Sequence, residues 1–197
     1  FFATLFKDLV IWISFLVRPE IWVGQGLELN RWLSGVTFGL SLAANIWGIR
    51  TAFKGPIVRN VKVRLPGHAL QKEDLRVVQI SDLHVGPFIS REYVTNVVNI
   101  VTGLKPDVIA ITGDMGDGYA PLLSDDLAPL ATLKPAGGTF YVTGNHEYYW
   151  EVEQWTAKMA ELGAHVLYNV GREVKVKGHH IWMGGVPDYA CQRVKPE

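Results

Sequence analysis

The 197-residue sequence predicts an α/β domain built on a parallel β-sheet, preceded by an N-terminal membrane-spanning helix or helices. Two observations predict the domain: three short runs of apolar and β-branched residues, and helical patterns between them. A third observation, an uncharged stretch of eighteen residues, predicts the membrane helix. We therefore expect membrane-spanning segments over 1–50, a basic linker over 51–74 and the α/β domain over 75–197.

The uncharged stretch lies between Arg31 and Arg50 and is just long enough to cross a bilayer. Trp32 and Trp47 lie near its two ends, where aromatic side chains favour the membrane interface. The apolar residues 1–17 are interpreted as the remainder of an earlier span, so the number of spans stays open. A buried helical hairpin of a soluble protein is the alternative.

The residues that follow this stretch are basic. No acidic residue occurs before Glu73, whereas five bases do: Arg50, Lys54, Arg59, Lys62 and Arg64. The preceding loop, 18–31, has two bases and two acids. By the positive-inside rule, we expect the domain to lie on the cytoplasmic face of a membrane. The alternative is an ordinary solvated linker, with a short strand over 57–65.

Three buried strands are expected in the domain, because each run is continuously apolar or β-branched: 76–81, 108–113 and 139–144. Three helices are expected around them: one capped by Ser90 and ended before Pro106, a shorter one within 123–138 capped by Ser124, and one over 152–162 ended by Gly163. Strand–helix–strand repetition predicts parallel strands joined by right-handed crossovers. The reactive groups of such sheets collect at the carboxyl ends of the strands.

Polar residues follow all three predicted strands. Asp82 and His84 follow the first strand, Asp114 follows the second, and Asn145 and His146 follow the third. The spacing is 32 residues from Asp82 to Asp114 and 31 from Asp114 to Asn145, one βαβ unit each. We therefore expect these residues to meet at one edge of the sheet, beside turns that use Gly86, Gly113 and Gly144.

Carboxylate, imidazole and amide groups suit divalent metal ions such as Mn, Fe or Zn. Asp114, in the middle loop, is interpreted as the bridge between two metal ions, with Asp82 and His84 on one and Asn145 on the other. Two cations about 3.5–4 Å apart form the clamp that enzymes use for phosphoryl hydrolysis. His146, next to Asn145, is interpreted as the proton donor to the leaving group.

The motifs "DLH", "GDMGD" and "GNHE", in this order, resemble those of the calcineurin-like metallophosphoesterase family. Residues 75–188 resemble a membrane-associated bacterial branch of that family, through "ISDLHVGP", "TGDMGDG", "YVTGNHEYY" and "GGVPD". The resemblance implies the metallo-dependent phosphatase fold, a four-layer αββα sandwich, of which this chain holds an incomplete N-terminal part. It also implies a hydrolase of phosphoester or pyrophosphate bonds.

The resemblance assigns roles to the same residues. It implies that Asp82 and His84 bind the first metal ion and that Asp114 bridges the two ions. It also implies that Asn145 binds the second metal ion and a phosphate oxygen, and that His146 is the general acid. Asp117 matches the second acid of the family's "GDxxD", and we expect it to orient a neighbouring side chain.

One part of the family pattern is missing. The family completes its site with a histidine after a further strand and a "GHxH" pair, and neither occurs here. We expect the late histidines, His165, His179 and His180, to be surface or structural residues. Because these motifs are missing, we expect the chain to be truncated at its C-terminus. A site with fewer ligands binds metal weakly, so we expect the chain by itself to have little or no activity.

We interpret the chain as part of a membrane-anchored phosphoester hydrolase with a dinuclear metal centre. Anchoring favours a phosphorylated substrate that is lipid-linked or nucleotide-linked. No nucleic-acid partner is expected, because the formal net charge is zero. One alternative is a non-catalytic membrane-anchored scaffold or binding module. The other is a membrane transport or assembly component with an incidental α/β domain.

Overall fold

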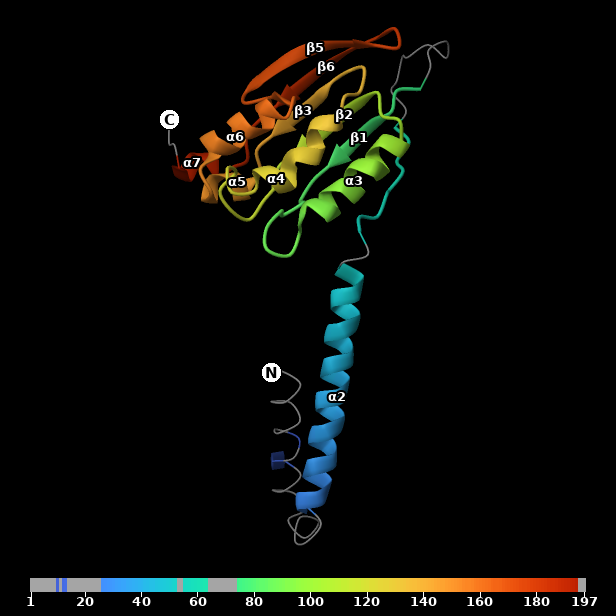
Figure 1. Ribbon diagram of the computed structural model, residues 1–197, viewed down its shortest axis with the longest axis vertical. Helices are drawn as coiled ribbons and strands as arrows, with labels where there is room; N and C mark the ends of the chain where they lie inside the picture. The colour runs from blue at the N-terminus through green and yellow to red at the C-terminus, as the bar shows by residue number, and fades with distance from the viewer. Residues whose placement is uncertain (1–9, 11, 14–25, 53–54, 64–73, 195–197) are drawn as a thin grey trace. The chain divides into compact units, whose positions relative to one another are not determined.

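The computed structural model describes residues 10, 12–13, 26–52, 55–63 and 74–194. The chain divides into two compact units, Phe1–Gly55 and Pro56–Glu197, each of which is described by itself. The main described element of the first unit is α2 (Gly26–Ala52; Figure 1). Within it, Trp32–Thr51 is long and apolar enough to span a membrane, as some soluble core helices and signal sequences also are. The segment over 1–17, interpreted above as an earlier span, lies almost entirely outside the described residues.

The predicted strand over 57–65 is wrong for its described part. Residues 57–63 form neither helix nor strand, and residues 64 and 65 lie outside the described residues. The alternating β-branched residues of this segment are exposed: Ile57 by 85%, Val61 by 80% and Val63 by 76%. Because a strand is stable only when it pairs and buries one face, sequence alternation alone forms none here.

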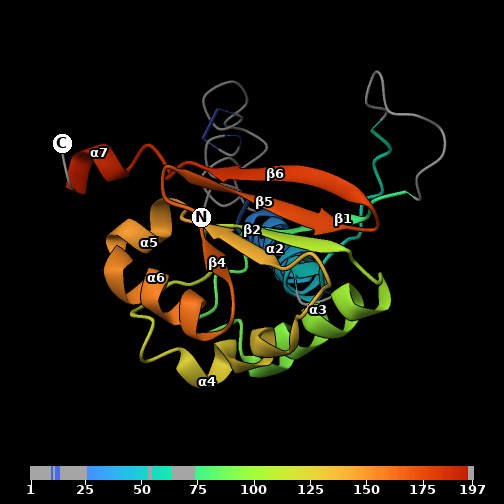
Figure 2. The same ribbon diagram turned by 90° about the horizontal axis from the view of Figure 1, so that it is seen from above.

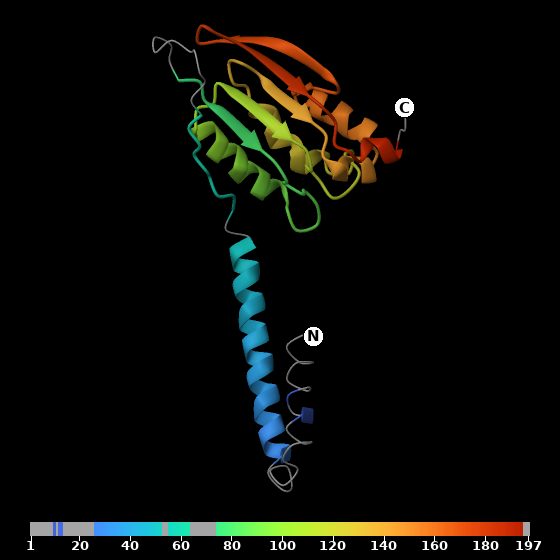
Figure 3. The ribbon, with the colours of Figure 1, turned by 180° about the vertical axis from the view of Figure 1, so that it is seen from behind.

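A four-stranded parallel sheet forms the centre of the second unit, in the order β1-β2-β3-β4. Its strands are β1 (Val77–Ile80), β2 (Val108–Thr112), β3 (Thr139–Val142) and the two-residue β4 (His165–Val166). The register pairs Val77 with Val108 and Ile109 with Thr139. β1, β2 and β3 point the same way in Figure 3, so all three predicted strands and their parallel direction are confirmed.

Helices cover one face of this sheet (Figure 2). They are α3 (Arg91–Gly103), α4 (Ser124–Leu127) with the 3₁₀ helix η2 (Ala128–Thr132), and α6 (Val152–Glu161). The valine stripe of α3 is buried as predicted, at Val94, Val97, Val98 and Val101. This stripe packs in one core with Ile109, Ile111, Tyr141 and Trp155.

The predicted helix ends are partly corrected. Ser90 occupies the N-cap position of α3 without a side-chain cap hydrogen bond. Ser124 is not a cap: Leu123 takes the cap position of α4, and the Ser124 hydroxyl instead accepts a hydrogen bond from Lys158 Nζ at 2.9 Å. A tertiary partner therefore uses the hydroxyl that the local pattern assigns to the helix end. Gly163 follows the end of α6, as expected, and adopts the left-handed conformation (φ 94°).

An antiparallel hairpin, β5 (Val170–Val176) and β6 (His179–Gly185), covers the opposite face of the sheet (Figure 2). Val174 and Val176 of the hairpin pack against Val108, Phe140 and Leu167 in a second core. The described residues of the second unit thus form three layers: helices, parallel sheet and hairpin. This is the αβ side of the predicted αββα sandwich, with the beginning of its second β-layer.

Candidate metal centre

Three chain segments meet at the carboxyl edge of the parallel sheet. We name them the first loop (81–90), the second loop (113–123) and the third segment (143–149), which contains α5 (Asn145–Tyr149). The first loop continues beside the second after their strands end. His84 N donates to Asp114 O at 3.1 Å, and Val85 N donates to Met115 O at 2.9 Å. Backbone hydrogen bonds therefore fix these two loops to one another.

Three of the predicted metal ligands have a left-handed backbone. The φ angles are 58° at Asp82, 49° at His84 and 54° at Asp114. Residues other than glycine rarely adopt this conformation, which costs of order 1–3 kcal/mol per residue and tends to occur at functional sites. The backbone hydrogen bonds between the two loops hold this geometry, which directs three polar side chains to one place.

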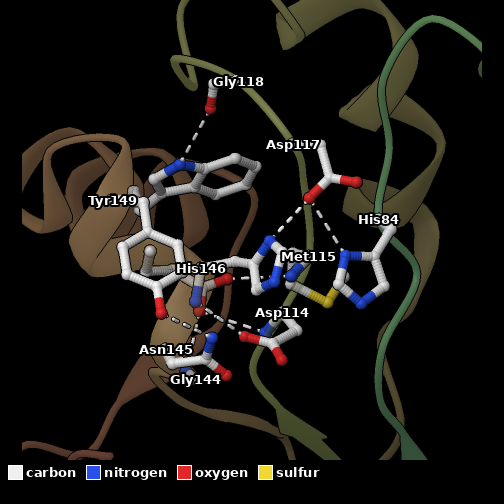
Figure 4. Close-up of polar contacts among 11 residues, drawn as sticks. His84, Asp114, Met115, Asp117, Gly118, Gly144, Asn145, His146 and Tyr149 are labelled. Carbon is white, nitrogen blue, oxygen red and sulfur yellow. Dashed lines mark hydrogen bonds and ion pairs between the residues drawn. The ribbon is translucent and has the colours of Figure 1, made fainter. Parts of the chain in front are cut away.

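The side chains of these three residues converge. One ligand atom each from Asp82, His84 and Asp114 lie within 4.8 Å of one another, as do those of a second group, His84, Asp117 and His146. Figure 4 shows His84, Asp114, Asp117 and His146 around a common centre. Two carboxylate oxygens and an imidazole nitrogen form a donor set that suits Mn, Fe or Zn. The residues present therefore fit the metal binding that the sequence predicts.

Asn145 and His146 lie in the first turn of α5, and not in an irregular loop. His146 N donates to Asp114 Oδ1 at 2.9 Å, which brings the start of this helix to the second loop. Asn145 Nδ2 lies 3.4 Å from the hydroxyl of Tyr149, one turn later (Figure 4). The structure thus brings all five predicted site residues to one edge of the sheet.

A single oxygen of Asp117 contacts two histidines. Asp117 Oδ1 lies 3.0 Å from His84 Nδ1 and 2.6 Å from His146 Nδ1, and the two rings meet edge to face at 4.5 Å (Figure 4). Burial by itself would raise the pKa of Asp117, but the hydrogen bonds to His84 and His146 outweigh it and hold the pKa below 3.8. With Nδ1 engaged in both rings, each Nε2 remains for another ligand.

Two of the three predicted turn glycines are required by close approach. A Cβ on Gly113, where φ is 84°, would lie 2.1 Å from Gly144 N, and a Cβ on Gly144 would lie 2.3 Å from Asp114 Oδ1. The second loop and the third segment therefore touch only because both residues lack a side chain. Gly86 differs from this expectation, because a Cβ there would meet nothing closer than 3.5 Å.

Sequence reasoning missed the role of Glu147. This side chain is fully buried, and its carboxylate accepts hydrogen bonds from three backbone amides: Asp114 N (3.0 Å), Met115 N (2.8 Å) and Gly144 N (2.7 Å). The signal was present: a Glu three residues after the Gly144 cap position has the spacing of a capping box. That the same carboxylate also reaches the second loop follows from no local pattern, because Asp114 and Met115 lie in a different segment.

The late histidines are engaged elsewhere. His165 Nδ1 lies 2.6 Å from an Arg172 nitrogen, and its ring packs on Phe140. His180 Nδ1 lies 2.8 Å from Glu173 Oε1, and His179 is buried at the start of β6. Within the part of the chain that the structure describes, the two ligand groups at the sheet edge include none of these histidines. That they are surface or structural residues stays a prediction.

Comparison with known proteins agrees with this architecture. Residues 75–184 match the family model described as calcineurin-like phosphoesterase. The chain is 36% identical over 153 residues to a "Transmembrane protein with metallophosphoesterase domain" of Bos taurus, covering 73% of this chain and 34% of that protein. It is 32% identical over 135 residues to an "Uncharacterized metallophosphoesterase" of Helicobacter pylori strain J99, covering 68% of this chain and 36% of that protein. The chain thus spans about a third of the length of these curated relatives. With its three-loop site and this match over more than half its length, the chain belongs to the calcineurin-like phosphoesterase family.

Proposed function

We propose that this chain is part of a membrane-anchored phosphoester hydrolase with a dinuclear metal centre. The observation that carries the proposal is the convergence of Asp82, His84 and Asp114, whose ligand atoms lie within 4.8 Å on a left-handed backbone. Membership of the calcineurin-like phosphoesterase family supports the reaction class.

In this proposal, Asp82 and His84 bind one cation, Asp114 bridges, and Asn145 binds the second cation and a phosphate oxygen. Divalent cations in such a site neutralise phosphate charge and make water a better nucleophile at neutral pH. His146 donates a proton to the leaving group. Its Nδ1 is held by Asp117 at 2.6 Å, so its Nε2 is the atom that acts.

The proposed substrate is phosphorylated and either lipid-linked or nucleotide-linked. Support for a membrane location comes from the apolar helix Trp32–Thr51 and from relatives in Bos taurus and Danio rerio that are named transmembrane proteins. The proposed organisation is a membrane-spanning part over 1–50, a linker over 51–74 and a catalytic part over 75–197. The basic residues after the helix favour the cytoplasmic face.

The test of the enzyme proposal is Mn²⁺-stimulated hydrolysis of a chromogenic phosphodiester by this chain, with Asp114→Asn as the control. Hydrolysis that the substitution removes would support the proposal. A silent chain that gains activity when extended to the length of its relatives would mean that further ligands are needed. No activity in either form would favour the alternative below.

The test of membrane anchoring is alkaline extraction of membranes from cells that produce the chain. We expect the chain to remain with the lipid pellet, because Trp32–Thr51 is long and apolar enough to span the bilayer. Release of the full-length chain into the supernatant would contradict the anchor.

A membrane-anchored scaffold without catalysis is the second candidate. It is favoured by one observation: His165 and His180 contact Arg172 and Glu173, so these late histidines add no ligand to the edge where Asp114 lies. This candidate predicts that Asp114→Asn leaves the biological function of the full-length protein unchanged, whereas the enzyme proposal predicts its loss.

A further inference from the structure

We propose that Glu147 is a positioning residue that fixes the third segment to the second loop and thereby places Asn145 beside Asp114. The inference rests on the proposed function, because it concerns the geometry of the two predicted metal positions. It extends the role of Glu147 from the capping of α5 to the contact between the third segment and the second loop.

The contacts of Glu147 support this role. Its side chain is fully buried, and both oxygens are used: Oε2 accepts from Asp114 N and Gly144 N, and Oε1 accepts from Met115 N. A carboxylate has only acceptors, so three converging N–H groups match it without conflict. Hydrogen bonds to a charged acceptor are about twice as strong as neutral ones, which compensates for the burial of the group.

The two halves of the site are held by different means. The first loop is joined to the second by backbone hydrogen bonds, including Asp82 N to Gly113 O at 3.2 Å and His84 N to Asp114 O at 3.1 Å. The third segment is joined to Asp114 through side-chain acceptors, the Glu147 carboxylate and Asp114 Oδ1. Loss of Glu147 should therefore release the Asn145 side of the site and leave the Asp82 side in place.

A Glu147→Gln substitution is the sharpest change, because it keeps the size of the side chain and replaces one acceptor oxygen by a donor. An amide N–H then faces a backbone N–H, at Met115 or at Asp114 and Gly144. We expect the third segment to shift away from the second loop. The matched control is Glu161→Gln on α6, where the side chain is 68% exposed and pairs with Lys158.

The first measurement is amide hydrogen exchange of the full chain in detergent micelles without metal. In Glu147→Gln we expect the amides of Asp114, Met115 and Gly144 to lose protection, while His84 keeps it through its backbone partner. Glu161→Gln should match the unsubstituted chain at all of these positions. Unchanged protection of the three amides in Glu147→Gln would overturn the proposal.

The second measurement is Mn²⁺ titration of the same samples, followed by electron paramagnetic resonance. We expect two binding events in the unsubstituted chain, with one weakened about 10–100-fold and the other unchanged in Glu147→Gln. Equal weakening of both events, or of neither, would overturn the positioning role. Absence of Mn²⁺ binding both in this chain and in a chain extended to the length of its relatives would refute the proposed function instead, and the exchange measurement would then decide the role of Glu147 by itself.

A folding defect in Glu147→Gln would show as a general loss of amide protection. Glu147→Asp then replaces it in both measurements, because it keeps the carboxylate but shortens its reach. We expect partial loss of protection at Asp114 and Gly144 and a smaller effect on the same binding event. An Asp variant equal to the unsubstituted chain in both readouts would overturn the proposal.

Discussion

Aspartate side chains lie at both edges of the parallel sheet, but their surroundings differ. At the amino edge, Asp107 is 7% exposed, and its carboxylate has two partners that offset its burial. It accepts a hydrogen bond from Arg76 N at 2.8 Å and forms an ion pair with Lys177 Nζ at 2.9 Å. At the carboxyl edge, Asp82 and Asp114 lie on a left-handed backbone beside His84.

The difference lies in what each edge leaves available. Asp107 joins the start of the sheet to the β5–β6 turn, and its partners use both oxygens. At the other edge, the described ion pairs involve Asp117 with His84 and His146, whereas Asp82 and Asp114 have no Lys or Arg partner among the described residues. One edge therefore stabilises the fold, and the other keeps acidic groups ready for a cation. Four substitutions or conditions test this contrast.

The largest effect is expected for Asp114→Asn. The change removes the charge of the proposed bridging ligand, so Mn²⁺-dependent hydrolysis should fall strongly. We expect a larger loss than the ~10–100-fold that is typical when a residue that only orients a metal ligand is replaced. The free energy of unfolding should change by less than about 0.5 kcal/mol, because an Asn oxygen still accepts from His146 N. Kinetics and chemical denaturation of the same protein measure both, and a large loss of stability would contradict the contrast.

Asp117→Asn should have an intermediate effect. Its oxygen holds Nδ1 of both His84 and His146, so the substitution loosens two rings without removing a proposed ligand. We expect a loss of about 10–100-fold in activity and in metal affinity. Metal titration and steady-state kinetics check this, and the prediction is wrong if the loss equals that of Asp114→Asn.

Asp107→Asn should affect stability and spare the site. The substitution weakens the contacts to Arg76 and Lys177 at a buried position, so we expect a destabilisation of about 1–3 kcal/mol. Urea unfolding measures it. Metal affinity should match that of the unsubstituted protein, because Asp107 lies at the opposite edge; a parallel loss of metal would contradict the separation of roles.

The smallest effect concerns acid stability. Burial by itself would raise the pKa of Asp107, but the Arg76 hydrogen bond and the Lys177 ion pair outweigh it and hold the pKa below 3.8. A lowered folded pKa adds stability above the unfolded value of about 3.9, and this stability is lost as pH falls from there through the folded pKa. Urea midpoints between pH 5 and pH 3 should therefore fall less steeply for Asp107→Asn than for the unsubstituted chain. Equal slopes would contradict the assignment.

Much of the fold could be predicted because its signals are local. Continuous β-branched runs gave the three strands, and the valine stripe gave α3, since burial on both faces or on one stripe selects those residue types. The spacing of Asp82, Asp114 and Asn145 gave the edge at which they meet, because parallel strands place their ends together. The strand over 57–65 failed because alternation predicts a strand only where a partner exists.

The sequence by itself determined the family, the three parallel strands and which residues reach the carboxyl edge, because motifs and one-unit spacings are properties of the chain. Tertiary structure alone decided how those residues are held. The three amides that meet Glu147 come from two segments about thirty residues apart, and the Ser124 hydroxyl found Lys158 instead of its own helix end. Hydrogen bonds between distant segments form only when the chain packs, so no local sequence pattern predicts them.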